Sequence, residues 1–561
     1  MKGMFPAVAL ALLLARPAEG QRASSEGLEV SFGQQGLEKL SYGGEVLMDG
    51  GTHPDDRLHI WHIKTTDRAG KPRTDGPYGW GETNQGRAWD PATKTWTYTF
   101  QWGTIAVRYK QAGDAMDIIV TETNRAGSGV LLHGATIYPV TLRPHSDASG
   151  AAITDAVEMP GITIARWASA EVAAVTPDAR AELWSGFEQH GSALSAIVSA
   201  TVPDSLPPSA ARKEQVIRPG ESSTFLFSLR FSRRDTPAQD IAGDALRSFA
   251  TRWPAGEMWK DRRVIGTVFL ASSPKGDKTV RAGFPANPRR YFNDAKLDVS
   301  QVESFQARVL QQAMDVVANL KRMHAQGAIT WDIEGEEYPQ DTSYVCAPDM
   351  IQQSAPEMDL PVKAGFYAGI KLDDAYFKII RDGGFRVGVC VRPQHFTPGL
   401  GGSARQVTME DSEVATELIR KIRYAHDRWG ATLFYLDSTV EADGRPLPPD
   451  VLEKAAAAFP DSLLIPEEST TRDYRAMAPF MSFLFHGETG TPDWIKALYP
   501  NSFGVNLVND VDSTRLSDHH GALVDAVREG DVLMIHADSW HENNDKVVEI
   551  YRQAAKAGKR H

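Results

Sequence analysis

Two apolar runs in the C-terminal half of the chain end in acidic residues. Thr432–Asp437 closes on an aspartate, and Leu463–Glu467 closes on a glutamate that is followed by Glu468. If the runs are adjacent strands of one parallel sheet, their ends lie about 4.8 Å apart. A retaining glycosidase needs two carboxyl groups about 5–5.5 Å apart, one as the nucleophile and one as the acid/base. The pattern therefore predicts Asp437 as a nucleophile and Glu467 as its acid/base partner.

The two successive glutamates leave the identity of the acid/base open. Because strand side chains alternate, only one of Glu467 and Glu468 can point inward, and Pro466 can distort the strand end. Glu467 is the preferred candidate because it is nearer the strand, with Glu468 as the alternative. The carboxylates could also be purely structural, capping the following helix or pairing with Arg472 and Arg475.

A second acidic segment, Trp331–Tyr338, offers a competing catalytic pair. Asp332 and Glu334 share a strand face by the period of two, so they could bind sugar hydroxyls, relay a proton or be the catalytic pair. Glu336 and Glu337 add two carboxylates, and this density of oxygen ligands leaves a structural Ca²⁺ site as an alternative. The spacing of an EF-hand loop is absent, so no cofactor is predicted from this segment.

These acids belong to a longer pattern of eight apolar runs, most of which end in a polar or acidic residue. Helical patterns separate most of the runs, and eight strand–helix repeats of this kind close a parallel sheet into a (β/α)₈ TIM barrel. The runs are Val264–Leu270, Ala328–Asp332, Phe385–Arg392, Thr432–Asp437, Leu463–Glu467, Phe480–His486, Phe503–Asn509 and Val532–Asp538. In such a barrel the active site lies at the C-terminal ends of the strands.

This rule converts the polar residues at and after the run ends into predicted substrate contacts. They are Asp332, Glu334, Arg392, His395, Tyr435, His486, Asn509, Asp538 and Trp540. The scattered histidines show neither an HExxH motif nor a paired spacing, so no catalytic metal is predicted. The absence of GxSxG, GxGxxG and Walker motifs argues against a serine esterase and against nucleotide binding.

The rest of the chain divides into a β-rich part and a short connector. Residues 27–233 show strand patterns, and Trp96–Trp102 alternates aromatic and polar residues, so we predict an N-terminal antiparallel β-sandwich. Residues 237–256 carry a helical pattern without a Gly/Ser-rich tract, which predicts a helical connector. The barrel occupies residues 261–561, and its first long helix is expected to begin with a capping box of Ser300 and Glu303.

The N-terminal residues and the overall charge limit where the protein is expected to be located and which partners it is expected to bind. Residues 1–20 combine Lys2, a short apolar stretch and small residues before Gly20, the pattern of a signal peptide. A secreted or periplasmic protein without membrane insertion is therefore expected. The formal net charge of −12 disfavours nucleic acid and anionic membrane surfaces as partners. The oligomeric state has no signature in the sequence.

The chain has two cysteines, Cys346 and Cys390. This number excludes a disulfide-rich scaffold and a four-cysteine zinc site. The two could pair in an oxidising compartment. The place of Cys390 within the third predicted barrel strand favours a buried free thiol instead.

The layout is similar to that of several groups of secreted retaining α-glycosidases, in which a galactose-mutarotase-like β-supersandwich is joined to a (β/α)₈ barrel. These are the endo-α-N-acetylgalactosaminidases, the α-galactosidase clan and the α-glucosidase clan. The segment Phe434–Asp437 resembles the strand-four nucleophile of these groups, and Ile465–Glu467 resembles the strand-five acid/base of the endo-acting group. The other two clans place an acid/base aspartate on strand six, where this chain has His486 and Glu488 instead.

The resemblance implies retaining hydrolysis of α-linked sugars in an oligosaccharide, a polysaccharide or a glycoconjugate. Two alternatives stay open beside it. A hydrolase of the same fold could use Asp332 and Glu334, or the barrel could bind carbohydrate without cleaving it.

Overall fold

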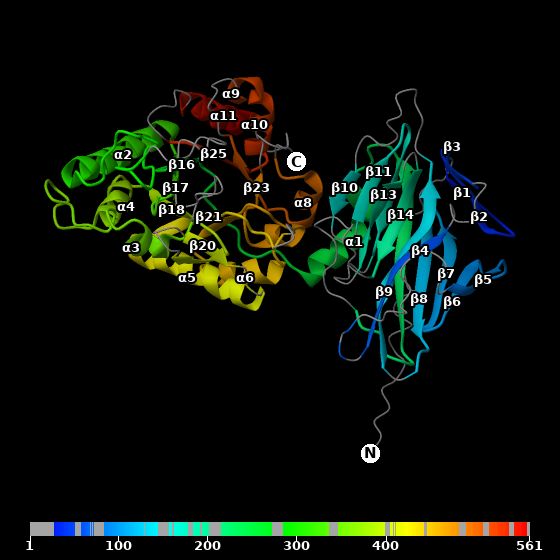
Figure 1. Ribbon diagram of the computed structural model, residues 1–561. Helices are drawn as coiled ribbons and strands as arrows, with labels where there is room; N and C mark the ends of the chain where they lie inside the picture. The colour runs from blue at the N-terminus through cyan, green and yellow to red at the C-terminus, as the bar shows by residue number, and fades with distance from the viewer. Residues whose placement is uncertain are drawn as a thin grey trace, which may run out of the picture. The chain divides into compact units, whose positions relative to one another are not determined.

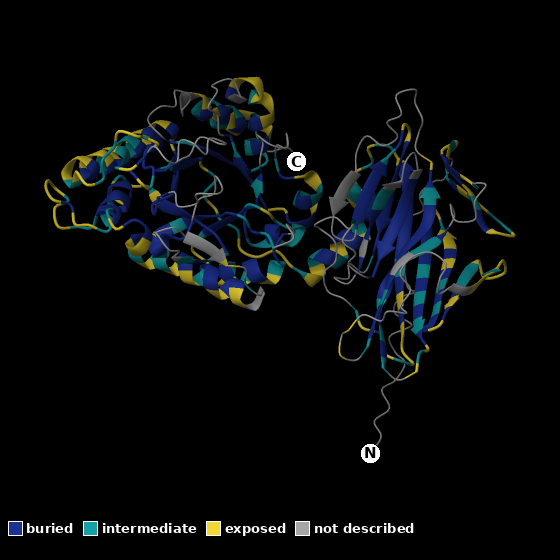
Figure 2. Ribbon diagram, viewed as in Figure 1, coloured by how far each residue is buried: buried dark blue, intermediate teal, exposed yellow. Residues whose placement is uncertain are grey.

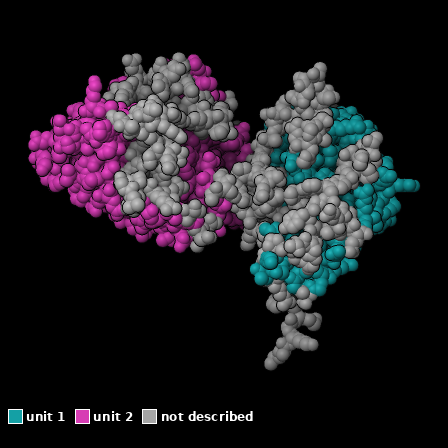
Figure 3. Space-filling view, in the orientation of Figure 1, with its two compact units in different colours: residues 1–202, 211–236 teal, residues 203–210, 237–561 magenta. Residues whose placement is uncertain are grey.

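The computed structural model describes residues 27–557, except 51–57, 68, 70, 72–83, 128, 144–155, 160–161, 178–182, 191–192, 201–214, 272–283, 336–345, 399–403, 408, 410, 442–445, 482–489, 509–514 and 538–543. The predicted signal peptide lies outside the described residues. Contacts between residues divide the chain into two compact units (Figure 3). Unit 1 comprises residues 1–202 and 211–236, and unit 2 comprises residues 203–210 and 237–561.

Unit 1 is built from antiparallel strands, as the alternating pattern predicts. The strands are β1 (Leu28–Gly33), β2 (Gly36–Tyr42), β3 (Glu45–Asp49), β4 (His59–Asp67), β5 (Asn84–Asp90), β6 (Thr95–Phe100), β7 (Gly103–Ala112), β8 (Ala115–Asn124), β9 (Val130–Leu142), β10 (Ala156–Met159), β11 (Ile162–Arg166), β12 (Ala170–Val175), β13 (Trp184–His190), β14 (Ala193–Ser199) and β15 (Ser222–Arg233). One sheet has the order β10-β11-β12-β15-β8-β7-β6-β5, a second has the order β13-β14-β9-β4, and β1-β2-β3 forms a third (Figure 1).

The aromatic residues of β6 belong to the core of unit 1. Tyr98, Phe100 and Trp102 are buried, and Trp96 packs against the same cluster. Their polar neighbours lie on the opposite face, because successive strand residues point to opposite sides. The alternation of buried and more exposed residues along such strands is visible in Figure 2. These tryptophans therefore stabilise the sheet packing, and they are not free platforms for sugar rings.

The connector forms α1 (Ala238–Arg252), which begins directly after Pro237. Its apolar residues Ile241, Leu246 and Phe249 are buried. The end of the segment is tied to the barrel, because the Tyr499 hydroxyl donates to the Trp253 carbonyl at 3.0 Å. The helix thus belongs to unit 2.

Unit 2 contains the eight-stranded parallel sheet that the eight apolar runs predict. The strands are β16 (Ile265–Phe269), β17 (Gly327–Trp331), β18 (Arg386–Val391), β21 (Ala431–Leu436), β22 (Leu463–Pro466), β23 (Phe480–Met481), β24 (Val505–Leu507) and β25 (Val532–His536). β16, β17, β18, β21 and β22 pair in chain order, as do β23, β24 and β25, and β25 pairs with β16. Between β22 and β23 the ring is bridged by the Ala478 N–H, which donates to the Leu464 carbonyl at 3.1 Å. The fold class, a β-sandwich followed by a (β/α)₈ barrel, is confirmed.

Helices and one hairpin follow the strands. The helices are α2 (Val302–Met323), α3 (Ile351–Ser354), α4 (Leu372–Asp382), α5 (Asp411–Trp429), α6 (Pro449–Ala458), α8 (Asp493–Leu498), α9 (Arg515–Asp518), α10 (His520–Arg528) and α11 (Asn544–Ala557), with short 3₁₀ turns η3 (Pro348–Met350) and η4 (Thr471–Arg475). A hairpin of β19 (His395–Pro398) and β20 (Ala404–Val407) follows β18. In the part of the chain that is described, we find no helix that is both long and apolar enough to cross a membrane.

The predicted capping box at the start of α2 is wrong. The N-cap residue is Gln301, and its side chain makes no capping hydrogen bond. The Ser300 hydroxyl instead donates to the carboxylate of Asp298 at 2.6 Å. A local turn competes for this short polar side chain, as is common for serine beside a helix start.

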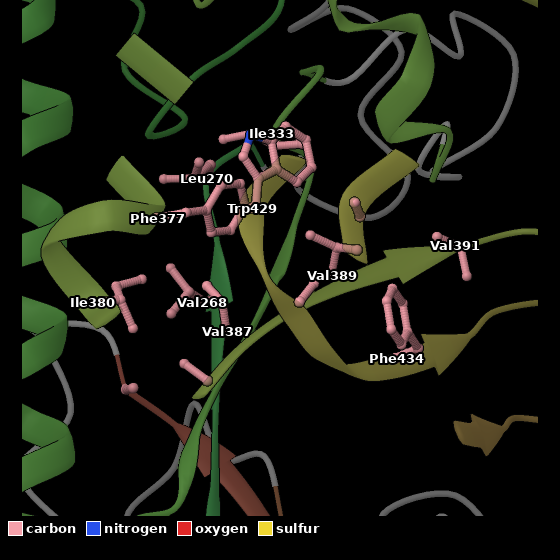
Figure 4. Close-up of a cluster of buried hydrophobic side chains, with 14 of the residues drawn as sticks. Val268, Leu270, Ile333, Phe377, Ile380, Val387, Val389, Val391, Trp429 and Phe434 are labelled. Atoms are coloured by element: carbon pink, nitrogen blue, oxygen red, sulfur yellow. The ribbon is translucent and has the colours of Figure 1, made fainter. Parts of the chain in front are cut away.

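The barrel strands divide their side chains between two apolar clusters. The interior cluster includes Ile329, Cys390, Tyr435 and Ile465, which lie inside the ring of strands. The outer cluster packs the other strand face against the helices, and Figure 4 shows part of it: Val268, Val387, Val389, Val391 and Phe434 from strands, Phe377 and Ile380 from α4, and Trp429 from the end of α5. This alternation decides which strand-end residues face the interior.

Candidate active site

Asp437 lies at the C-terminal end of the fourth barrel strand. Its N–H donates to the Val391 carbonyl at 2.9 Å, so the parallel ladder continues to this residue. Leu433 and Tyr435 belong to the interior cluster, and alternation places Asp437 on the same face. Its carboxylate is therefore presented where the C-terminal strand ends meet.

The Asp437 carboxylate contacts Arg392, Ser438 and Cys346, besides Glu467. Arg392 Nη2 lies 3.1 Å from both carboxylate oxygens. The Ser438 hydroxyl donates to Oδ1 at 2.9 Å, and the Cys346 thiol contacts Oδ2 at 3.6 Å. The ion pair is almost fully buried, with 9% of each side chain exposed. A buried carboxylate with a charged partner and a hydroxyl donor is stabilised in its ionised form.

Glu467 follows the neighbouring strand β22 and meets Asp437 across the ladder. Its N–H donates to the Leu436 carbonyl at 3.0 Å, and alternation from Ile465 of the interior cluster puts its side chain on the inner face. The Ser438 N–H donates to Glu467 Oε2 at 2.7 Å. The residue between the two strand ends thus links both carboxyl groups.

Burial, reinforced by the negative charge of Asp437, raises the pKa of Glu467 to about 7. Hydrogen bonds from the Ser438 N–H and the Tyr435 hydroxyl act in the opposite direction. Two neighbouring carboxyl groups cannot both ionise easily, so one of them retains a proton. The cation of Arg392 lies on Asp437, which makes Glu467 the protonated partner near neutral pH.

Two other predicted residues close to this pair occupy different positions. Glu468 is exposed, and its backbone N–H donates to the Thr439 hydroxyl at 2.7 Å. Tyr435 is buried in the barrel interior, where its ring centroid lies 5.0 Å from that of Trp331 and 5.3 Å from that of Phe480. The structure therefore places Glu467, and not Glu468, beside Asp437. Tyr435 packs in the barrel interior, next to Glu467.

Hydrogen bonds hold both the backbone N–H and the backbone carbonyl of Arg392. Its N–H donates to the Cys346 carbonyl at 2.8 Å, and its carbonyl accepts a hydrogen bond from Lys421 Nζ at 2.9 Å. Burial disfavours the charged guanidinium, but Asp437 and the neighbouring thiols hold the pKa of Arg392 above its ordinary value. The positive charge next to Asp437 is therefore permanent at all working pH values.

Asp332 and Glu334 do not share a strand face, contrary to the expectation from the period of two. Strand β17 ends at Trp331, and Asp332 has a left-handed backbone with φ 62°. The Gly335 N–H then closes a turn onto the Asp332 carbonyl at 2.9 Å. Alternation applies only to an extended backbone, so the turn separates the two carboxylates into different surroundings.

Glu334 supports the segment that carries Cys346. It is buried, and its Oε1 accepts the Ala347 N–H at 2.7 Å. Burial raises the pKa of Glu334 to about 7, with a smaller contribution from Asp349. The side chain therefore acts on the Asp437 site through the Cys346–Ala347 backbone.

Three residues around the site hold left-handed backbones although none is glycine. They are Asp332, Cys346 and Ser438, with φ values of 62°, 47° and 52°. Such conformations are disfavoured for residues with a Cβ atom, and they concentrate at functional sites, where the surrounding structure enforces them. At Ser438 the unusual turn is what directs the backbone N–H at Glu467.

His395 lies apart from this group. It begins β19, its Nδ1 lies 3.0 Å from Glu417 Oε1 on α5, and 40% of its side chain is exposed. Among the described residues, no contact joins it to Asp437 or Glu467. His486, Asn509, Asp538 and Trp540, the other predicted substrate contacts, lie outside the described residues, as do the Glu336 and Glu337 of the predicted Ca²⁺ alternative.

Sequence reasoning missed three residues that shape the site. Gln394 Nε2 donates to the Ser438 carbonyl at 2.8 Å, and Cys346 contacts Asp437. Lys421 is fully buried and holds the carbonyls of Arg392 and Gln394. Only Lys421 carries a sequence signal, because it lies three residues after position 418 and four before position 425, both of which are apolar and buried on the same helix face.

Comparison with known proteins gives similarity at the level of solved structures. No protein-family model matches the sequence, and no curated protein matches it. The α-galactosidase AgaB of family GH36 from Geobacillus stearothermophilus is 10% identical, with 95% of this chain and 83% of that chain covered and a TM-score of 0.42. The α-N-acetylgalactosaminidase NagBb from Bifidobacterium bifidum, solved with GalNAc, is 12% identical, with 95% and 93% covered and a TM-score of 0.47. Both matches cover 95% of this chain at low sequence identity.

Proposed function

We propose that the protein is a glycoside hydrolase that cleaves O-glycosidic bonds with retention of anomeric configuration. The observation that supports this most directly is the contrast between two adjacent carboxyl groups. Asp437 is paired with Arg392, while Glu467 has a pKa of about 7. Two carboxyl groups with different environments at the ends of neighbouring strands are what the double-displacement mechanism requires.

In the first step an Asp437 oxygen attacks the anomeric carbon while Glu467 donates its proton to the departing glycosidic oxygen. The products are a covalent glycosyl–aspartate ester, the free leaving group and an ionised Glu467. In the second step Glu467 takes a proton from water, and the resulting hydroxide attacks the anomeric carbon. The ester bond breaks, the Asp437 carboxylate is restored, and the sugar leaves with its original configuration.

The surrounding residues have supporting roles in this scheme. The permanent charge of Arg392 holds and orients the Asp437 carboxylate for its role as nucleophile. The Ser438 N–H orients Glu467, and the Tyr435 hydroxyl supports it from below. His486, Asn509, Asp538 and Trp540 at other strand ends are proposed as sugar contacts, and the chemistry needs no cofactor.

The proposed substrate is an α-linked oligosaccharide, polysaccharide or glycoconjugate, and the proposed location is outside the cytoplasmic membrane. The α-preference rests on the resemblance of Phe434–Asp437 to the nucleophile strand of retaining α-glycosidases. The location rests on the signal-like pattern of residues 1–20.

The first experiment is a screen of aryl α- and β-glycosides, followed by NMR assignment of the anomer released. We expect turnover with retention, a loss of at least about 10³-fold in Asp437→Asn, and recovery of Asp437→Gly by azide with an inverted glycosyl azide as product. Glu467→Gln should lose activity, whereas the matched variant Glu468→Gln should stay close to wild type, because Glu468 is exposed. An inverted product, or full activity in Asp437→Asn, would contradict the proposal.

The competing assignment to Asp332 and Glu334 is favoured by one observation, the raised pKa of Glu334. Against it, the left-handed turn at Asp332 separates the two carboxylates, and a Glu334 oxygen is occupied by the Ala347 N–H. Residual turnover in Asp332→Asn, with none in Asp437→Asn, separates the two assignments. Sugar binding without turnover on any glycoside would instead indicate a carbohydrate-binding protein.

A further inference from the structure

The two cysteines of the chain lie side by side in the barrel interior. Cys390 belongs to β18, Cys346 precedes η3, and their Sγ atoms are 3.0 Å apart although 44 positions separate them. Both side chains are buried, with relative exposures of 1% and 3%. A disulfide bond has a sulfur–sulfur distance of about 2.05 Å, so the atoms lie about 1 Å from bonding distance.

Their surroundings disfavour a cation site made of Cys346, Cys390 and Asp437, three residues whose potential ligand atoms lie within 4.8 Å of one another. Burial raises the pKa of Cys346 to about 12 and raises that of Cys390 well above its ordinary value. Thiols bind zinc as thiolates, and these two are protonated near neutral pH. The guanidinium of Arg392 already neutralises Asp437, and it would repel a cation placed there.

We propose that Cys346 and Cys390 form a disulfide bond when the chain folds in an oxidising compartment, and that this bond fastens the segment around η3 to the strand end that carries Arg392. The Arg392 N–H already donates to the Cys346 carbonyl, so the bond joins backbones that are neighbours. The chain has no third cysteine, which leaves one intramolecular pairing. The proposal concerns a covalent modification and stands without the glycosidase assignment.

The oxidant is a disulfide, either that of a thiol–disulfide oxidoreductase or oxidised glutathione. The thiolate of one cysteine attacks a sulfur of the oxidant and releases one thiol. The second cysteine then attacks the mixed disulfide and releases the other thiol. The two cysteines lose two protons and two electrons, and the oxidant is reduced to two thiols. Because both side chains end buried, the exchange takes place before the barrel closes over them.

The bond would act on stability and on the surroundings of Asp437. It closes a loop that contains α3 and α4, and a closed loop restricts the unfolded chain more than the folded one. It also removes the Cys346 S–H, a weak donor to Asp437. Arg392 and Ser438 remain partners of Asp437 in both redox states.

The direct test is the intact mass of the full chain after unfolding in iodoacetamide without reductant. Protein folded with oxidised glutathione should be two hydrogens lighter than the dithiol and carry no adduct, and prior reduction should yield two adducts. The Cys390→Ser variant should carry one iodoacetamide adduct after reduction, and without reduction one iodoacetamide adduct or one glutathione, because it lacks the second thiol that resolves the mixed disulfide. Two adducts on the wild-type chain without reduction overturn the proposal.

A second measurement tests the structural role and remains informative if a variant folds poorly. The wild-type chain folded with oxidised glutathione should unfold about 5 °C higher than the same chain folded with reductant. The double variant Cys346→Ser, Cys390→Ser should unfold at one temperature in both conditions. An equal or lower midpoint for the oxidised wild type overturns the fastening role. One zinc per wild-type chain that is lost in Cys390→Ser overturns the disulfide in favour of a metal site.

Discussion

At the scale of single residues, the site depends on giving two like carboxyl groups different partners. Asp437 has Arg392 at 3.1 Å, whereas Glu467 has the Ser438 N–H, the Tyr435 hydroxyl and a negative neighbour. Burying an unpaired carboxylate costs free energy. At Asp437 the permanent cation of Arg392 offsets this cost. In the proposed mechanism, these different partners distinguish the nucleophile Asp437 from the acid/base Glu467 although both are carboxyl groups.

The first prediction concerns the pH dependence of the reaction. Glu467 must be protonated to act as the acid, and its pKa is about 7, so kcat/KM should fall as the pH rises through about 7. For a dinitrophenyl glycoside, whose leaving group needs no proton, Glu467→Gln should abolish this alkaline limb. A limb of the same position in the variant would show that another group titrates.

At the scale of elements, α5 carries the residue that fixes the end of β18. Lys421 donates from the buried face of the helix to the carbonyls of Arg392 and Gln394, and its Nζ lies 3.6 Å from Glu417. Burial lowers the pKa of Lys421 to about 8, so the ammonium is retained at neutral pH by these oxygen partners. The helix thereby holds both Arg392, which contacts Asp437, and Gln394, which contacts Ser438.

The second prediction is that Lys421→Met destabilises the barrel and lowers its activity. Removing one partner of a buried charge network costs about 3–5 kcal/mol, and the freed Arg392 carbonyl lets the guanidinium shift away from Asp437. We expect a lower unfolding midpoint, a lower kcat and little change in KM. Calorimetry and steady-state kinetics check these outcomes.

Lys378 on α4 is the matched control for Lys421. It pairs with Asp382 at 2.8 Å in an exposed i,i+4 arrangement. Lys378→Met should cost less than about 1 kcal/mol and leave kcat unchanged, because exposed ion pairs contribute little. Equal effects of the two substitutions would contradict the positioning role of Lys421.

At the scale of the whole molecule, several buried carboxyl groups bind protons more tightly in the folded chain than in the unfolded one. Burial raises the pKa values of Glu334, Asp373 and Asp473 to about 7, alongside that of Glu467. Below the unfolded pKa of about 4.3 the protonated groups carry no penalty. As the pH rises toward 7 the unfolded chain loses these protons first, so stability falls with pH over this window.

The third prediction is that Glu334→Gln flattens the pH dependence of stability. Between pH 5 and pH 8 the barrel of the wild type should lose stability as the pH rises. In Glu334→Gln this loss should be smaller by about 3 kcal/mol, because the amide does not titrate and one pKa unit corresponds to about 1.4 kcal/mol. Denaturant unfolding at several pH values measures the slope. The exposed variant Glu303→Gln should keep the wild-type slope. A steeper slope in Glu334→Gln would reverse the assigned sign.

The sequence alone determined the order and type of the barrel elements. Each of the eight apolar runs overlaps an observed strand, because a strand buried on both faces must be apolar along its length. Parallel order then brings strand ends together, so the meeting of Asp437 and Glu467 follows from local pattern and a fold rule. The sequence left Glu467 and Glu468 both open, because Pro466 could distort the strand. In the structure Pro466 pairs with Leu436, so alternation from Leu463 and Ile465 places Glu467 on the interior face.

Tertiary structure alone decided the features that depend on turns and on contacts across the barrel. The left-handed turn at Asp332 separates it from Glu334, and no short-range pattern marks a non-glycine residue for that backbone. Cys346 meets Cys390 and Asp437 through the path of a loop, and Lys421 meets Arg392 through the packing of α5 on β18. Strand period and helix period are local properties of a sequence. The partners of a buried charge or thiol are instead set by which distant segments pack together.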